Sequence, residues 1–254
     1  MTEPTAKTVL KGSGQAEDAS GALARLQTLE AHYRAQRDAR AVFAGAYLVI
    51  TSAMHDALRE RRFLDNPWVE EYLTTFANLY LQATAQYEND LVQGSGEAPP
   101  AWALAFQTCQ VKGVSPLAHL LLGVNAHVNR DLALALVHVG IHTRQLERYE
   151  DHVRVNEVLN AAVNDLQAKV TEQAPALAHL DALFGNWDER IACRVVSWAR
   201  DTAWKNAVVL HGAQGAAFEH RLDRVDRRAL QYALMIRRES RFFGARAAPG
   251  TTFE

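Results

Sequence analysis

The sequence of 254 residues is poor in cysteine and proline and lacks the motifs of several common protein classes. Its two cysteines, Cys109 and Cys193, form no CxxC unit, which argues against a disulfide framework or a cysteine zinc site. Both lie in apolar stretches, so we expect buried, reduced thiols. The absence of a G-x-S-x-G elbow, a P-loop or a Rossmann glycine pattern gives no support to a serine hydrolase or a nucleotide-binding enzyme.

A strong charge bias and a long apolar run are also missing. The net charge is -2 and the pI is near 6.6, so nucleic acid is not expected as a partner. No window of about 18 apolar residues is free of charge, so we expect no transmembrane helix and no membrane partner. The N-terminal stretch lacks the apolar region of a secretory signal, and a cytoplasmic location is therefore expected.

Apolar residues recur at three- and four-residue spacing through nearly all long segments, which predicts helices. The sequence therefore predicts a single all-α domain of about eight helices around a central long helix, over residues 19–243. We expect a disordered tail over 1–18 and a flexible tail over 244–254. The expected helices are 19–36, 39–62, 68–91, 101–109, 117–144, 150–172, 188–211 and 221–243, with a brief one at 175–183.

The central predicted helix, 117–144, carries several side chains that are costly to bury. At about 100° per residue, His127, Asp131, His138 and His142 fall within roughly 60° of one another on one face. A His-x3-Asp pair is a natural half of a divalent metal site, and His127 with Asp131 has this spacing. His127 and His142 lie about 22 Å apart along the axis, so all four side chains cannot bind one ion.

Two interpretations of the His127–Asp131 pair remain open. The pair is either a hydrogen bond that holds neighbouring helices together, or part of a site to which Asn125 and Asn129 also belong. If the pair is a site, it would bind one divalent ion (zinc, iron or manganese), which would promote the hydrolysis of an ester or phosphoester. Without a metal, Asp131 would orient His127 as the acid–base of an isomerase or cyclase acting on an apolar small molecule.

The rival from another class is a non-catalytic helical module that binds a small ligand. Tryptophan and tyrosine stripes, with Trp68 and Tyr72 among them, either line such a ligand pocket or form ordinary core. Arg200 either points inward to meet Asp131 or a substrate anion, or lies solvated at the surface. Apolar stripes on several helices are compatible with a homodimer.

The stretch LLLGVNAHVNRDLALAL resembles the signature N-A-H-(I/V)-N-x-D-L of an uncharacterised, mainly bacterial family of helical domains. Softer similarities in LDNPWVEEYLTTFANLYLQA, PPAWALAF, DHVRVNEVL and WARDTAWKNAVVL extend the resemblance from about Tyr47 to Leu210. Asp151, Val155 and Asn156 fit the family's D-(F/Y)-x-x-V-N pattern, whereas His152 takes its aromatic place. The family implies no activity, but its pattern adds Asn156 to the candidate catalytic residues.

A more distant resemblance is to zinc-dependent phospholipases C and single-strand-specific nucleases, which are all-helical. His127 and Asp131 match their His-x3-Asp pair, His138 falls near their next ligand, and His152 with Asn156 approximates their last pair. Their ligand at an N-terminal tryptophan has no counterpart, so a three-zinc site is not expected. The resemblance implies one divalent ion held by His127 and Asp131 with Asp151, His152 or His138.

Overall fold

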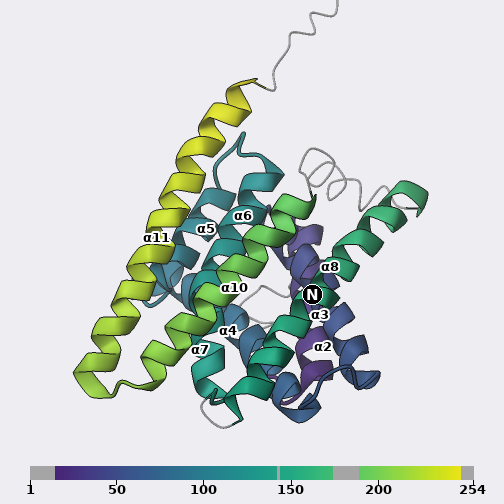
Figure 1. The fold of residues 1–254 in the computed structure, drawn as a ribbon. Helices are drawn as coiled ribbons and strands as arrows, with labels where there is room; N and C mark the ends of the chain where they lie inside the picture. The colour runs from purple at the N-terminus through teal and green to yellow at the C-terminus, as the bar shows by residue number, and fades with distance from the viewer. Residues whose placement is uncertain (1–14, 142–143, 174–188, 247–254) are drawn as a thin grey trace, which may run out of the picture.

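The computed structural model describes residues 15–141, 144–173 and 189–246, and within these ranges helices are the only regular secondary structure (Figure 1). The continuous run α6–η1–α7 counts as one helix, which gives eight in the described ranges and confirms the all-α prediction. The elements are α2 (Ala19–Ala35), α3 (Ala41–Arg59), α4 (Asn66–Gln93), α5 (Pro100–Cys109), α6 (Pro116–Ala126), the π-helical turn η1 (His127–Asp131), α7 (Leu132–His138), α8 (Gln145–Gln173), α10 (Glu189–His211) and α11 (Gly215–Arg246).

Several helices begin where the sequence supplies a side-chain cap. The Asp18 carboxylate accepts a hydrogen bond from the Gly21 N–H at 2.7 Å and caps α2. Ser115 caps α6 by accepting from the Ala118 N–H at 3.3 Å, and the helix starts on Pro116, as predicted. These caps satisfy N–H groups that have no partner inside the helix, so the local sequence fixes where each helix starts.

The central helix differs from the prediction in two respects. It contains the π-helical turn η1, in which the Leu132 N–H bonds to the His127 carbonyl, five residues earlier. It also ends at His138 and does not continue to residue 144, because Gly140 adopts a left-handed φ of 69°. Helix α11 starts at Gly215, six residues before the expected start at 221. The expected helix 175–183 lies outside the described residues.

The run α6–η1–α7 is surrounded by the other helices. Its α6 half packs against α3, α5 and α11, its α7 half packs against α4 and α10, and η1 contacts α4, α10 and α11. The buried residues form two hydrophobic clusters, one on each half. At the α3 crossing a Cβ on Gly123 would lie 2.4 Å from the Phe43 ring, so only glycine allows this close approach. The His127–Asp131 pair therefore lies where the two clusters meet.

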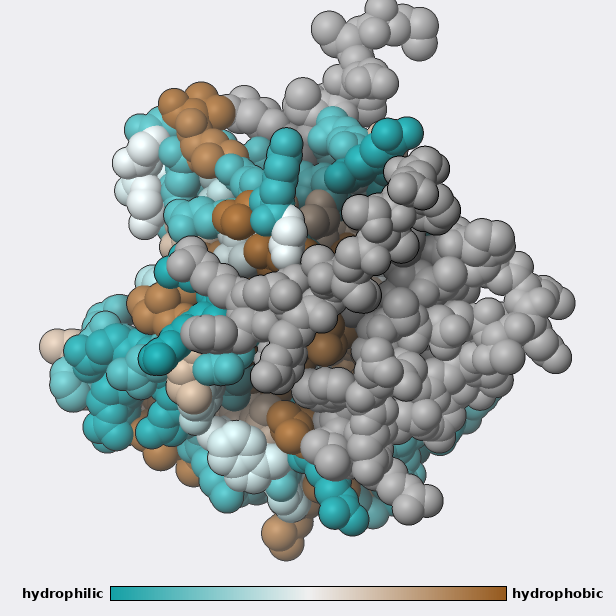
Figure 2. All heavy atoms as spheres, turned by 90° about the horizontal axis from the view of Figure 1, so that it is seen from above, coloured by the Kyte–Doolittle hydropathy of each residue, from teal (hydrophilic) through white to brown (hydrophobic). Residues whose placement is uncertain are grey.

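The surface shows scattered hydrophobic patches, and Cys109 is partly buried. Separate hydrophobic patches lie among mainly hydrophilic side chains on the face in Figure 2. Cys109 is a half-buried free thiol whose pKa is raised to about 12 by burial, and the Cys193 side chain lies outside the described part.

Two helical runs, Ala41–Arg59 and Pro116–His138, are long and apolar enough to cross a membrane by length and composition alone, which the sequence analysis did not expect. Core helices pass the same test, and 61% of the second span is buried inside the fold, so this is weak evidence for a membrane span.

Candidate functional site: a buried His–Asp pair beside an apolar pocket

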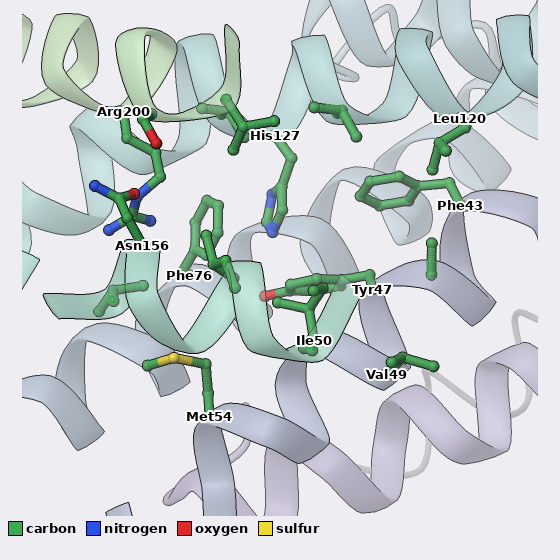
Figure 3. A pocket seen from close by; sticks show the side chains of 18 of the residues that line it. Phe43, Tyr47, Val49, Ile50, Met54, Phe76, Leu120, His127, Asn156 and Arg200 are labelled. Carbon is green, nitrogen blue, oxygen red and sulfur yellow. The ribbon is translucent and has the colours of Figure 1, made fainter. Parts of the chain in front are cut away.

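A cavity of about 250 Å³ lies between α3, α4, α6, η1, α8 and α10 (Figure 3). Its wall is mainly aliphatic and aromatic, with side chains such as Phe43, Ile50 and Phe76. A few polar side chains interrupt this wall, chiefly Tyr47, Tyr72, His127, Asn156 and Arg200. The volume is just below the range of about 300–1,000 Å³ typical of small-molecule sites, and the apolar wall with few polar groups is their usual composition.

His127 contributes its imidazole ring to this wall from the π-helical turn. The residue is 2% exposed, and its Nδ1 lies 3.1 Å from the Asp131 Oδ2. A carboxylate only accepts hydrogen bonds, so Nδ1 carries the proton and donates it to Asp131. The other nitrogen, Nε2, is therefore a lone-pair acceptor, and it is buried without a hydrogen-bond partner among the described residues.

Asp131 is held from three directions and is fully buried. Its Oδ2 accepts the Trp102 indole N–H at 2.7 Å as well as the His127 N–H. Its Oδ1 accepts from the Arg130 guanidinium at 2.8 Å, and Arg130 also donates to Asp226 at 2.6 Å. Charged hydrogen bonds of this kind compensate the cost of burying the carboxylate, which explains how an aspartate fits into the core.

Aromatic rings enclose the His127 imidazole. Phe76 stacks on it with ring centroids 3.5 Å apart and planes 7° apart, and Tyr47 meets it edge-on at 4.5 Å. Figure 3 shows the ring directed toward Tyr47. Burial lowers the pKa of His127 below its ordinary value of 6.5, and Asp131 offsets only part of that effect. The ring is consequently neutral at pH 7, with Nε2 in its basic form.

A second polar group lies on the α8–α10 side of the pocket. Arg200 is 4% exposed and donates to the Asn156 side-chain oxygen at 2.7 Å and to the His152 carbonyl at 2.8 Å. His152 holds Arg200 at two further points, since its Nε2 lies 3.2 Å from the Arg200 carbonyl and its Nδ1 lies 3.4 Å from the guanidinium. Burial and then the Arg200 charge hold the pKa of His152 well below 6.5, so this imidazole is neutral too.

The structure divides the predicted site residues into groups. His127 and Asn156 line the pocket, and Asp131 supports His127 from behind. Asn125 and Asn129 are not in the lining: the Asn125 amide donates to the Ala229 carbonyl at 2.9 Å, and the Asn129 amide donates to the Asn125 oxygen at 2.9 Å. These two asparagines tie the central helix to α11.

The remaining predicted ligands lie elsewhere. Asp151 is fully buried and accepts the Leu64 and Asp65 backbone N–H groups, each at 2.7 Å, so it holds the turn before α4. His138 is exposed, so its expected place on the same face as the buried His127 is wrong, because the π-helical turn changes the helical register between them. His142 lies outside the described residues.

The predicted metal ligands do not fit a metal centre as they stand. Across the described residues, no group of three or more His, Cys, Asp or Glu side chains is arranged to hold an ion. Both Asp131 oxygens are taken by N–H donors, and the Arg130 guanidinium at 2.8 Å already supplies the positive charge beside them. Both His152 nitrogens face Arg200, which leaves no lone pair for a metal.

Sequence reasoning missed several partners of the pair. Trp102 and Phe76 come from other helices at long sequence separation, and no spacing rule connects them with His127. Arg130, which precedes Asp131 in the chain, was not among the predicted site residues. A signal was available for Arg200, whose apolar flanks Ala199 and Ala203 are both buried. Arg200 does point inward, but it contacts Asn156 and His152, and it makes no contact with Asp131.

Comparisons with known proteins place the chain without naming an activity. No curated protein and no solved structure matches it. One family model, described as a family of unknown function (DUF5995), matches residues 19–239, which is nearly all of the helical domain. On this match the chain belongs to the DUF5995 family of unknown function.

Proposed function

We propose that this protein binds a small, mostly apolar molecule in the central pocket and that His127 moves a proton on it without a metal, as in an isomerase. The observation that carries the proposal is the basic Nε2 of His127, which has no partner among the described residues and lies in a mainly apolar wall, with Nδ1 fixed by Asp131. A buried polar atom without a partner costs free energy, and a bound ligand would recover it.

The arrangement assigns a role to each residue of the pair. Nε2 removes a proton from a carbon next to an unsaturated group, and the imidazolium returns it to a different carbon, so no other reactant is consumed. Asp131 orients the ring and stabilises the imidazolium. Trp102 and Arg130 keep Asp131 in place through hydrogen bonds, and Arg130 also supplies a positive charge beside it. The apolar wall keeps bulk water away from the base.

Proton abstraction by a buried base can be tested with 5-nitrobenzisoxazole, a small neutral aromatic probe. Removal of its C3 proton breaks the N–O bond and releases a coloured cyanonitrophenolate. We expect the wild type to release this product faster than His127→Gln, which keeps a side chain of similar size but has no base, by about 10²–10⁴-fold.

The matched control is His138→Gln, which removes an exposed imidazole from the same central helix and should leave the rate unchanged. Equal rates for the wild type and His127→Gln would overturn the catalytic proposal. Should these equal rates be combined with tight, saturable binding of the probe, the protein would instead be a non-catalytic ligand-binding module.

A further inference from the structure

Arg200 is a buried guanidinium that no carboxylate balances in the described part of the chain. The residue is 4% exposed, and the ion pairs of the described residues do not include it. Its four contacts are all to neutral acceptors, which belong to Asn156, Tyr72 and His152. Buried charges are normally paired because burying an unpaired one is expensive.

The guanidinium has hydrogen-bonding capacity left over. Its Nε–H donates to Asn156, and one terminal nitrogen faces His152. The other terminal nitrogen carries two N–H groups, and its single hydrogen bond among the described residues is to the Tyr72 hydroxyl, at a long 3.4 Å. Burial raises the pKa of Tyr72 above its ordinary 10.0, despite the Arg200 charge, so this hydroxyl keeps a proton to donate. Both donors belong to residues that line the pocket.

The polar and apolar parts of the pocket are separate. In Figure 3, Arg200 and Asn156 lie together on one side, whereas Phe43, Val49 and Leu120 lie on the other side, beyond His127. A ligand that satisfies both parts has one anionic end and an apolar body. A carboxylate matches the donors, because a guanidinium N–H and a tyrosine O–H can each bond to it.

We infer that the ligand of the central pocket is an apolar monocarboxylic acid whose carboxylate pairs with Arg200 and accepts the Tyr72 hydroxyl. The inference rests on the pocket of the proposed function and names its substrate class. The hydrocarbon body would then extend past His127 toward Phe43, which brings its carbon atoms near the base.

The test uses one reporter and two matched competitors. N-phenyl-1-naphthylamine, a neutral dye that fluoresces in apolar sites, reports occupancy of the pocket, and octanoate and 1-octanol compete with it at pH near 7. These competitors share a chain length and differ in the charge of the end group. We expect octanoate to displace the dye from the wild type at a concentration at least about tenfold lower than 1-octanol, the ratio that a charged hydrogen bond supplies.

Variants assign this preference to Arg200. Arg200→Gln should remove it by weakening octanoate about tenfold or more while 1-octanol binds as before. Tyr72→Phe removes one hydroxyl and keeps the aromatic ring and the Arg200 charge, so it should weaken octanoate binding by a smaller factor. This variant keeps the test decisive if Arg200→Gln fails to fold. Arg194→Gln, at an exposed arginine on the same helix, is the matched control and should change nothing.

The outcomes separate this inference from the proposed function. Dye binding with no preference for octanoate in the wild type overturns the carboxylate inference and leaves a base in an apolar pocket. Loss of the preference in Arg194→Gln as well as in Arg200→Gln overturns the assignment to Arg200. A wild type that binds no dye and neither competitor overturns the pocket itself, and with it both proposals.

Discussion

Two arginines near the pocket, the half-buried Arg130 and the buried Arg200, lie in opposite electrostatic surroundings. Arg130 donates to the carboxylates of Asp131 and Asp226, at 2.8 and 2.6 Å. Arg200 is more deeply buried, and among the described residues its guanidinium contacts an amide, a hydroxyl, a carbonyl and an imidazole, but no carboxylate. Arg130 completes a hydrogen-bonded network that stabilises the fold. Arg200 is a buried positive charge that lacks a carboxylate partner among the described residues.

The largest expected loss of stability comes from removing the charge of Arg130, which is paired with the carboxylates of Asp131 and Asp226. Arg130→Met should lower the free energy of unfolding by about 3–5 kcal/mol, because it leaves the buried Asp131 without its cation. Arg200→Met should cost much less, about 1 kcal/mol or below, because the loss of its hydrogen bonds is offset by removing an unbalanced charge. Urea unfolding of both variants measures the difference. Equal losses would show that both arginines serve the fold alike.

A smaller loss of stability is expected when the neutral donor to Asp131, the Trp102 indole N–H, is removed. Trp102→Phe keeps the aromatic packing and removes only the indole N–H, so it should cost about 1.5–3 kcal/mol, as for hydrogen bonds to charged groups. The same variant should slow the benzisoxazole reaction, because Asp131 then orients His127 less well. The control is Trp204→Phe, at a tryptophan of the hydrophobic cluster around α7, and it should leave the reaction rate unchanged.

Acidification should lower the free energy of unfolding more through His152, beside Arg200, than through the groups around Arg130. The folded-state pKa of His152 is held well below 6.5 by burial and by Arg200, so below about pH 6.5 the unfolded chain binds more protons than the folded one. Stability is therefore full above this pH and falls as the solution is acidified. His152→Gln should show a shallower fall, measured by urea unfolding against the same variant at about pH 8. An unchanged slope would contradict the protonation of His152 as the cause.

The smallest effect is expected outside both arginine networks. His138→Ala should change stability by no more than about 0.5 kcal/mol, since the residue is exposed at the end of α7. Dye binding in the pocket should also stay as in the wild type. A loss of binding would place His138 in the site, as the sequence spacing first suggested.

The sequence was sufficient for the helices but not for the roles of the polar residues on them. Hydrophobic periodicity and the caps at Asp18 and Ser115 act locally, so the positions of most helices could be read from the chain. The contact between His127 and Asp131 could also be expected, because an acid on an apolar face must have a partner. Their role could not, because it depends on Trp102 and Phe76, which other helices bring into contact.

The metal prediction shows what residue spacing alone leaves open. A His-x3-Asp pair faces the same way whether it binds an ion or makes a hydrogen bond within the pair, and the two cannot be separated without knowing what else points at the carboxylate. Here Arg130 is sequence-adjacent to Asp131 and still reaches its oxygen at 2.8 Å. Adjacent residues on a regular α-helix do not face one another, so the spacing rules gave no reason to expect this contact.

The wide turn at His127–Asp131 lets the central helix hold one residue more than a regular α-helix between two fixed contacts. Leu122 on one side and Leu136 on the other are both fully buried, each in a different hydrophobic cluster. Deleting Val128 would close the turn into ordinary α-helix and leave every later residue near its present angle around the axis, because the wide turn already absorbs one extra residue, worth about 100°. Such a deletion would therefore keep Leu136 in the core and change only the pair itself, whose two residues would then be three positions apart and not four. The extra residue thus serves the local geometry of the base and its carboxylate, while the packing of the two halves of the helix does not depend on it.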